Sequence, residues 1–153
     1  MLANYDLIAH IKGGEEYPDI KGTVGFKGVS GGTWVDVDVE GLPSFTAETE
    51  ETAQIGPHGF HIHKNPCGEG DFSTAGEHFD KGNNPHGNHS GDLPALFSNG
   101  GVSKMLFFTD RFTPDEVKGK SVVIHLSPDD YKTQPSGGSG ERIACGNIME
   151  VKK

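Results

Sequence analysis

Long apolar runs and basic residues are both scarce in this chain of 153 residues. A membrane-spanning helix needs about 20 consecutive apolar residues, and no such run occurs, so we expect no membrane span. The chain has 13 lysines and arginines but 22 aspartates and glutamates, so its formal net charge is −9. Nucleic-acid binding relies on basic patches, so this composition argues against nucleic acid and against anionic membrane surfaces. An anionic substrate would need a local positive spot, because the global field repels it.

Cysteine is equally rare, with Cys67 and Cys145 the only two. From the residues alone they could be free thiols, a disulfide or metal ligands. Neither lies in a Cys-x-x-Cys motif, so we do not expect thiolate metal ligation. A bond between them would close a loop of roughly 80 residues and stabilise the fold by about 4.5 kcal/mol on a chain-entropy argument.

The composition and the cysteines do not determine the cellular compartment of the protein. Residues 1–6 show neither a charged nor an apolar signal segment, so we expect no signal peptide in this chain. A disulfide would favour an exported, oxidising setting. Both a cytoplasmic location and export with a signal removed remain open.

Short strands dominate the pattern that is present. Residues 5–11 and 20–29 are apolar-rich or alternating, and 34–40 alternate strictly, with Val35, Val37 and Val39 expected to face the core. Asp36, Asp38 and Glu40 are then expected to face water. Strands separated by glycine-rich turns, without long helical periodicity, indicate an antiparallel architecture. We predict an all-β fold, an eight-stranded Greek-key β-barrel or sandwich with two long functional loops, in a single domain spanning residues 1–153.

The second half of the chain continues this pattern. Residues 95–97 and 102–108 read as strands on either side of a Ser98–Gly101 hairpin turn. Thr113 and Pro114 predict a single helical turn, with Thr113 as N-cap. Strands are expected at 121–125 and 142–151, separated by a second polar loop, 127–141.

The segment 64–94 has no apolar periodicity and is rich in Gly, Asn, Pro and His. A structureless loop of about 30 residues is unusual in a compact domain and is usually functional. A hydrophobic core cannot order such a segment, whereas bound metal can.

Histidines recur in and around this loop at spacings that suit metal binding. His61 and His63 are two apart on a predicted strand, so both side chains point to the same face. Taken singly, each motif has an ordinary explanation: surface histidines, a solvated polar loop, or a core histidine satisfied by hydrogen bonds. Together they offer seven candidate ligands, too many for one tetrahedral ion and suited to two ions sharing a histidine. These are His61, His63, His78, His86, His89, Asp92 and His125.

The order of these motifs resembles the copper/zinc superoxide dismutase family. The matching stretches are Gly59–His63, Ala75–Phe79, Gly91–Leu93, Val122–His125 and Arg142–Gly146. A further stretch, 128–133, and the short second loop are more similar to bacterial members than to animal ones. The resemblance is strong from His58 to Gly146.

The resemblance implies a role for each residue. Copper would be held by His61, His63, His78 and His125, and zinc by His78, His86, His89 and Asp92, with His78 bridging both ions. Asp129 matches a carboxylate that orients one histidine on each metal. Arg142 matches the arginine that attracts superoxide, and Cys67 and Cys145 match the family's disulfide.

The implied activity is disproportionation of superoxide to dioxygen and hydrogen peroxide, an antioxidant reaction. Copper cycles between Cu(II) and Cu(I), His78 takes part in the proton chemistry, and zinc is structural. A homodimer is one possible assembly, since family members occur as dimers and as monomers. The alternatives are a copper- and zinc-binding protein of this fold without dismutation, and a zinc hydrolase, which needs an open zinc position that a closed four-ligand set lacks.

Two features depart from the family pattern. Only two residues separate His86 from His89, which puts the zinc geometry in question. Glu77 adds a negative charge beside His78 that would weaken attraction of superoxide. Lys132 is the nearest candidate for a compensating charge, although a lone lysine is more often simply solvated.

Overall fold

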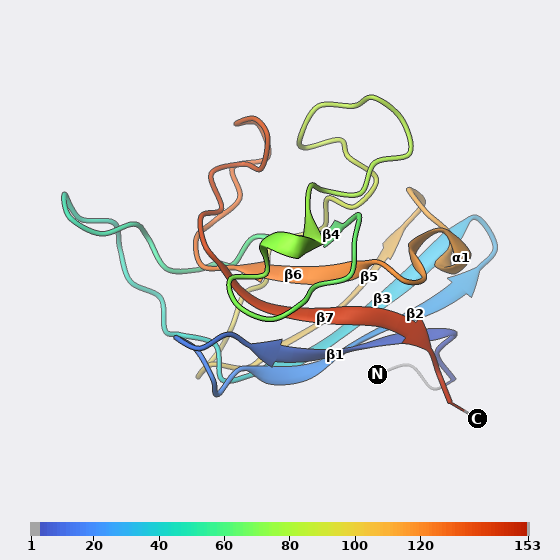
Figure 1. The fold of residues 1–153 in the computed structure, drawn as a ribbon, viewed down its shortest axis with the longest axis horizontal. Helices are drawn as coiled ribbons and strands as arrows, with labels where there is room; N and C mark the ends of the chain where they lie inside the picture. The colour runs from blue at the N-terminus through green and yellow to red at the C-terminus, as the bar shows by residue number, and fades with distance from the viewer. Residues whose placement is uncertain (1–3, 153) are drawn as a thin grey trace.

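The computed structural model describes residues 4–152 and shows one antiparallel sheet (Figure 1). The strand order is β4-β6-β7-β1-β2-β3-β5. The strands are β1 (Leu7–Gly13), β2 (Lys21–Val29), β3 (Gly32–Glu40), β4 (Phe60–His63), β5 (Ser103–Thr109), β6 (Ser121–His125) and β7 (Arg142–Glu150). Within the described residues, no helix is long and apolar enough to cross a membrane.

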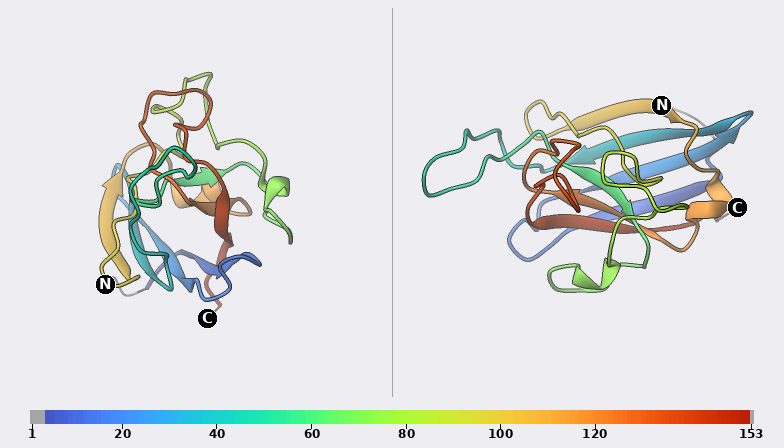
Figure 2. Two further views of the ribbon diagram at one scale, coloured as in Figure 1. Left: turned by 90° about the vertical axis from the view of Figure 1, so that its left-hand side faces the viewer. Right: turned by 90° about the horizontal axis from the view of Figure 1, so that it is seen from above.

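The sheet curls on itself, as the end-on view in Figure 2 shows. Neighbours such as β7 and β1, or β3 and β5, are far apart in sequence, as in a Greek key. The all-β, antiparallel prediction is therefore confirmed.

The predicted strand count was too high by one. Residues 95–97 form no strand, and only Leu96 pairs there, exchanging backbone hydrogen bonds of 2.9 and 2.8 Å with His58. Pro94 lacks an N–H, and the Ser98–Gly101 turn begins directly after Phe97, so too few residues remain to extend the ladder. Seven strands are formed among residues 4–152.

The strict alternation of β3 places Val35, Val37 and Val39 in the core as predicted. The expectation that Asp36 faces water is wrong, because Asp36 is only 5% exposed to solvent. The Tyr5 hydroxyl donates a 2.6 Å hydrogen bond to Asp36 Oδ2 and its ring covers the outer face of the sheet. Gly25 makes room for that ring, since a Cβ there would lie 2.5 Å from it.

The predicted helical turn is present as α1 (Pro114–Val117). Thr113 is the N-cap, and its backbone N–H donates to Glu116 Oε1 at 2.8 Å in a capping box. This turn leads directly into β6.

Two long loops cover the outer face of β4, β6 and β7, and both rise on the same side of the sheet (Figures 1 and 2). The first, residues 64–102, includes the 3₁₀ turn η1 (Ser73–Ala75). The second is residues 126–141. A disulfide between Cys67 and Cys145 ties the first loop to β7, as the resemblance implied.

Candidate metal centre

The alternation of β4 separates core side chains from candidate ligands. Phe60 and Ile62 enter the hydrophobic core, so His61 and His63 point to the opposite, loop-covered face. On the neighbouring β6, Val122 and Ile124 are likewise in the core, and His125 ends the strand. The sheet thus presents three imidazoles to the space beneath the two loops.

The first cluster brings together His61, His63, His78 and His125, each with a ligand atom within 4.8 Å of the others. The Nε2 atoms of His63 and His125 are 3.4 Å apart. Their other nitrogens are engaged, with His63 Nδ1 bound to the Gly76 carbonyl at 2.8 Å and His125 Nδ1 to the Gly140 carbonyl at 3.1 Å. His61 Nδ1 and His78 Nε2 are buried without a hydrogen-bond partner.

The second cluster lies on the other side of His78. Its Nδ1 is 3.3 Å from His89 Nδ1 and 3.0 Å from Asp92 Oδ1, and His86 Nδ1 is 3.2 Å from the same oxygen. A tetrahedral zinc site with bonds of 2.0–2.1 Å has ligand atoms about 3.3 Å apart. Despite the short gap between them, His86 Nδ1 and His89 Nδ1 lie 3.2 and 3.4 Å from the two Asp92 carboxylate oxygens.

His61 also lies within 4.8 Å of His78, His86 and Asp92. Its Nε2, however, is bound to Asp129 Oδ2 at 2.7 Å, and its ring is stacked on that of His78. His89 supplies the better fourth atom, because its Nδ1 is 3.4 Å from Asp92 Oδ2 as well as close to His78.

Asp129, from the second loop, connects the clusters. One carboxylate oxygen is 2.7 Å from His61 Nε2, and the other is 2.8 Å from His86 Nε2. Each ring is thereby oriented with its Nδ1 toward one cluster. Such contacts to the non-ligating nitrogen hold metal-binding imidazoles in place.

Burial keeps the four imidazoles of the first cluster neutral. It lowers the pKa of His63 to about 2 and that of His125 to about 4, and it lowers the pKa of His61 and His78 as well. Burial opposes ionisation of Asp92, but hydrogen bonding from His78 and the nearby histidines hold its pKa below the usual value. Neutral imidazoles and an ionised carboxylate are the forms that bind metal.

A cavity of about 670 Å³ leads to the first cluster. Its lining includes His63, His78, His89, His125 and Arg142. Arg142 Nη1 donates to the Phe72 carbonyl at 2.9 Å and Nη2 to the Gly76 carbonyl at 2.8 Å, so the first loop orients the guanidinium. Burial lowers the Arg142 pKa, and the charge of Asp71 opposes that effect.

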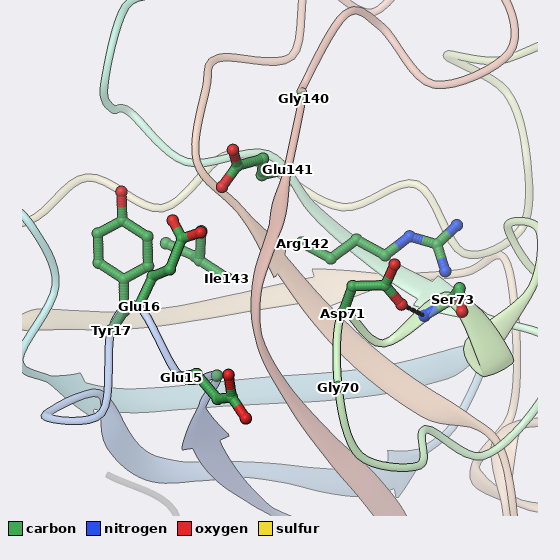
Figure 3. A pocket seen from close by; sticks show the side chains of 11 residues that line it. Glu15, Glu16, Tyr17, Gly70, Asp71, Ser73, Gly140, Glu141, Arg142 and Ile143 are labelled. Atoms are coloured by element: carbon green, nitrogen blue, oxygen red, sulfur yellow. Dashed lines mark hydrogen bonds between the residues drawn. The ribbon is translucent and has the colours of Figure 1, made fainter.

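A second cavity, of about 690 Å³, lies beside the same arginine and is acidic (Figure 3). In Figure 3 the Arg142 side chain extends toward Asp71 and Ser73, while Glu141 points the other way. Asp71 accepts a 3.0 Å hydrogen bond from the Ser73 N–H. Arg142 therefore separates a histidine-lined cavity from an acidic one.

The positive side chain near Glu77 at the cavity mouth is not Lys132, the candidate named from the sequence. Glu77 is highly exposed, with 86% of its side chain accessible, and its carboxylate is 3.7 Å from Lys64 Nζ. Lys64 and Lys120 line the cavity, whereas Lys132 is an exposed residue of the second loop outside that lining. Lys120 follows a helical turn with no apparent link to the site, so sequence reasoning missed it.

Two adjoining histidine clusters lie between the outer face of the sheet and the loops that cover it. This arrangement is that of an all-β metal-binding protein with a site for two metal ions. The family model for copper/zinc superoxide dismutase matches residues 20–148. The chain belongs to the copper/zinc superoxide dismutase family.

Individual relatives agree with this assignment. A Superoxide dismutase [Cu-Zn] of Deinococcus radiodurans is 38% identical, over 86% of this chain and 79% of that protein. One from Brucella abortus is 36% identical, over 76% of this chain and 78% of the relative. The solved Cu/Zn superoxide dismutase from Brucella abortus superposes with a TM-score of 0.72 at 31% identity, covering 92% of this chain and 97% of that one. A solved double mutant of a SOD-like protein from Bacillus subtilis superposes with a TM-score of 0.78 at 27% identity, covering 93% of this chain and 96% of that one.

Proposed function

We propose that this protein is a copper/zinc superoxide dismutase that converts superoxide to dioxygen and hydrogen peroxide. The observation that carries the proposal is the arrangement of nitrogens around His78. Its two ring nitrogens face two ligand clusters, and the first cluster opens to a cavity that Arg142 lines. Its relatives carry the name Superoxide dismutase [Cu-Zn].

In this proposal copper would be held by His61 Nδ1 and by Nε2 of His63, His78 and His125. The donor set fits, because imidazole nitrogens suit copper and two of the four atoms are buried without a protein partner. Bound copper supplies reversible one-electron chemistry between Cu(II) and Cu(I).

Zinc would be held by Nδ1 of His78, His86 and His89 and by Asp92 Oδ1. Four protein ligands would leave no open position on the ion, which is typical of structural zinc. This closure disfavours the zinc hydrolase alternative, which requires an open position for water.

Arg142 binds and orients superoxide. A guanidinium has five N–H donors, and the bonds to the Phe72 and Gly76 carbonyls engage one on each terminal nitrogen, which leaves donors for a small anion. The group is positively charged at any relevant pH, so it supplies the local attraction that the net charge of −9 does not. With zinc on His78 Nδ1, the buried Nε2, which has no hydrogen-bond partner, would be the ring atom able to hold a proton.

The alternative is a metal-binding protein of the same fold without dismutation. Loss of a first-cluster histidine or of the arginine would favour that alternative. Here His61, His63, His78 and His125 converge, and Arg142 lines the same cavity. The dismutase is therefore the better-supported function.

Metal content and activity test the proposal together. We expect close to one copper and one zinc per chain after reconstitution, with fast dismutation that is lost in His125→Ala. The exposed His10 provides a matched control, and His10→Ala should keep both metals and the rate. Zinc alone, or copper without dismutation, would contradict the enzymatic role and leave a metal-binding protein.

The single domain over residues 1–153 and the homodimer both stay predictions. Leu106 and Phe108 of β5 are exposed at 47% and 45%, and Phe108 packs edge-on against Trp34 at 5.8 Å between ring centroids. This apolar surface supports the dimer. Light scattering of wild type and Leu106→Asp tests it, with a monomeric wild-type protein as the contrary result.

A further inference from the structure

The turn from His86 to His89 carries two of the proposed zinc ligands, yet it has no regular secondary structure. Several of its backbone polar groups are bound by side chains. Asp92 Oδ2 accepts hydrogen bonds from the Gly87 and His89 N–H groups at 2.7 and 2.9 Å. Backbone hydrogen bonds join the Asn88 N–H to the Pro85 carbonyl and the Asp92 N–H to the His89 carbonyl. Two residues outside the turn, Arg111 and Gln134, supply further side-chain bonds.

Arg111 lies between β5 and α1. Its Nη1 donates to the His89 carbonyl at 3.0 Å and to the Gly87 carbonyl at 3.4 Å. The backbone N–H of Arg111 is itself bonded to Thr109 Oγ1 at 3.2 Å, directly after β5 ends. A charged donor from the edge of the sheet thus anchors the turn.

Gln134 approaches from the second loop. Its Oε1 accepts from the His86 N–H at 2.7 Å and its Nε2 donates to the His86 carbonyl at 3.3 Å. Nε2 also donates to the Lys132 carbonyl at 2.9 Å, which fixes the amide within its own loop. Both backbone polar groups of His86 are therefore paired with one side chain.

The chain has two arginines, and each binds a different part of the first loop. Arg142 binds the Phe72 and Gly76 carbonyls next to the copper-side histidines, and Arg111 binds the Gly87 and His89 carbonyls on the zinc side. Arg142 lines the histidine-lined cavity, whereas Arg111 is absent from that lining and donates to backbone carbonyls of the turn. Their chemistry differs accordingly: one is placed to meet substrate, and the other to position ligands.

We propose that Arg111 and Gln134 form a backbone clamp that sets the short His86–His89 turn in its zinc-binding geometry before metal arrives. The inference rests on the proposed zinc site and extends it to two positioning residues. Orienting residues around a metal site typically change metal affinity 10- to 100-fold when removed. The clamp fixes the backbone on both sides of the two-residue gap, where each Nδ1 lies within 3.4 Å of an Asp92 oxygen.

Zinc affinity of metal-free protein, measured by competition with a chromophoric chelator, tests the clamp without reference to activity. We expect Arg111→Gln and Gln134→Ala each to weaken zinc binding about 10-fold or more, and Arg111→Lys to retain part of the affinity. Lys104→Gln is the matched control, because it removes one exposed positive charge from β5 without touching the turn, and it should bind zinc like wild type. Cobalt(II) in the zinc site should give an altered visible spectrum in the two clamp variants only.

The outcomes separate the clamp from the site itself. Wild-type zinc affinity and cobalt spectra in folded Arg111→Gln and Gln134→Ala would overturn the clamp while leaving the zinc site intact. Should Arg111→Gln fail to fold, Gln134→Ala carries the test from the opposite side of the turn. Wild-type protein that binds no zinc would contradict the zinc site, and the clamp with it.

Discussion

The imidazole rings of His61 and His78 are stacked, with 3.9 Å between centroids and 28° between planes. His61 belongs to the copper-side cluster, and His78 belongs to both clusters. Because interiors are close-packed, neither ring can tilt without displacing the other. The two proposed metal positions are therefore joined mechanically as well as through a shared ligand.

This arrangement predicts a pattern of metal loss. His78→Ala should reduce both copper and zinc content, because it removes an atom from each cluster. His63→Ala should reduce copper and spare zinc, and His86→Ala should do the reverse. Elemental analysis after reconstitution checks the three variants, and a His78→Ala protein with full zinc would contradict the bridging role.

Gly137 lies directly against the Asp129 bridge. A Cβ at this position would be 1.9 Å from Asp129 Oδ1 and 2.7 Å from His86 Nε2. We expect Gly137→Ala to break the bridge and weaken metal binding about 10- to 100-fold.

Gly138 gives the matched control for that variant. Its φ of +70° is close to the +74° of Gly137, but a Cβ there meets no atom within 4 Å. Gly138→Ala therefore introduces similar backbone strain without the clash. Equal metal affinities in the two variants would show that strain, rather than Asp129, governs the effect.

Acid should destabilise the metal-free protein. The pKa values of His63 and His125 are lowered by burial to about 2 and about 4, against an ordinary 6.5 in the unfolded chain. The unfolded chain therefore binds more protons below pH 6.5, so this stabilisation is complete above that pH and falls as pH drops toward the folded values. Each histidine should contribute about 1.4 kcal/mol per pH unit over this window.

Urea unfolding of metal-free protein at several pH values measures this dependence. His125→Gln should show a shallower loss of stability with acid than wild type, and His10→Gln should match wild type because His10 is exposed. A free energy of unfolding that stays constant as the pH falls two units below 6.5 would refute the expectation.

The disulfide should stabilise the fold substantially. Cys67 and Cys145 are 78 residues apart, for which chain entropy predicts up to about 4.5 kcal/mol. Replacing both with serine should lower the free energy of unfolding by up to that amount, measured with denaturant on metal-free protein. Reductant should destabilise wild type and leave the double variant unchanged.

Arg142 should govern attraction of the anionic substrate. Arg142→Gln should lower the dismutation rate constant about 10-fold and weaken its dependence on ionic strength, because local charge raises encounter rates. Lys132→Gln makes the same change in net charge outside the cavity and should have a small effect. Stopped-flow rates over a range of salt concentrations check both variants, and equal losses would point to net charge instead.

The sequence by itself determined the class of fold and the chemistry of the ligands. Strict alternation placed the β3 valines inside, His61 and His63 had to share a face of β4, and the Thr113-Pro114 pair specified a helical turn, because these are local consequences of strand and helix periodicity.

Tertiary contacts decided the rest. Asp36 is buried because Tyr5 folds over it, and residues 95–97 form no strand because only Leu96 finds a partner, in His58. Which nitrogen of each histidine is free depends on carbonyls and on Asp129 from other loops, and Arg111 and Gln134 reach the zinc turn from 22 or more residues away in sequence. Such contacts join segments with no periodic relation to one another, so sequence patterns do not predict them. The sequence therefore predicts which residues are candidate ligands, whereas the positions of their ligand atoms are set only when the loops pack onto the sheet.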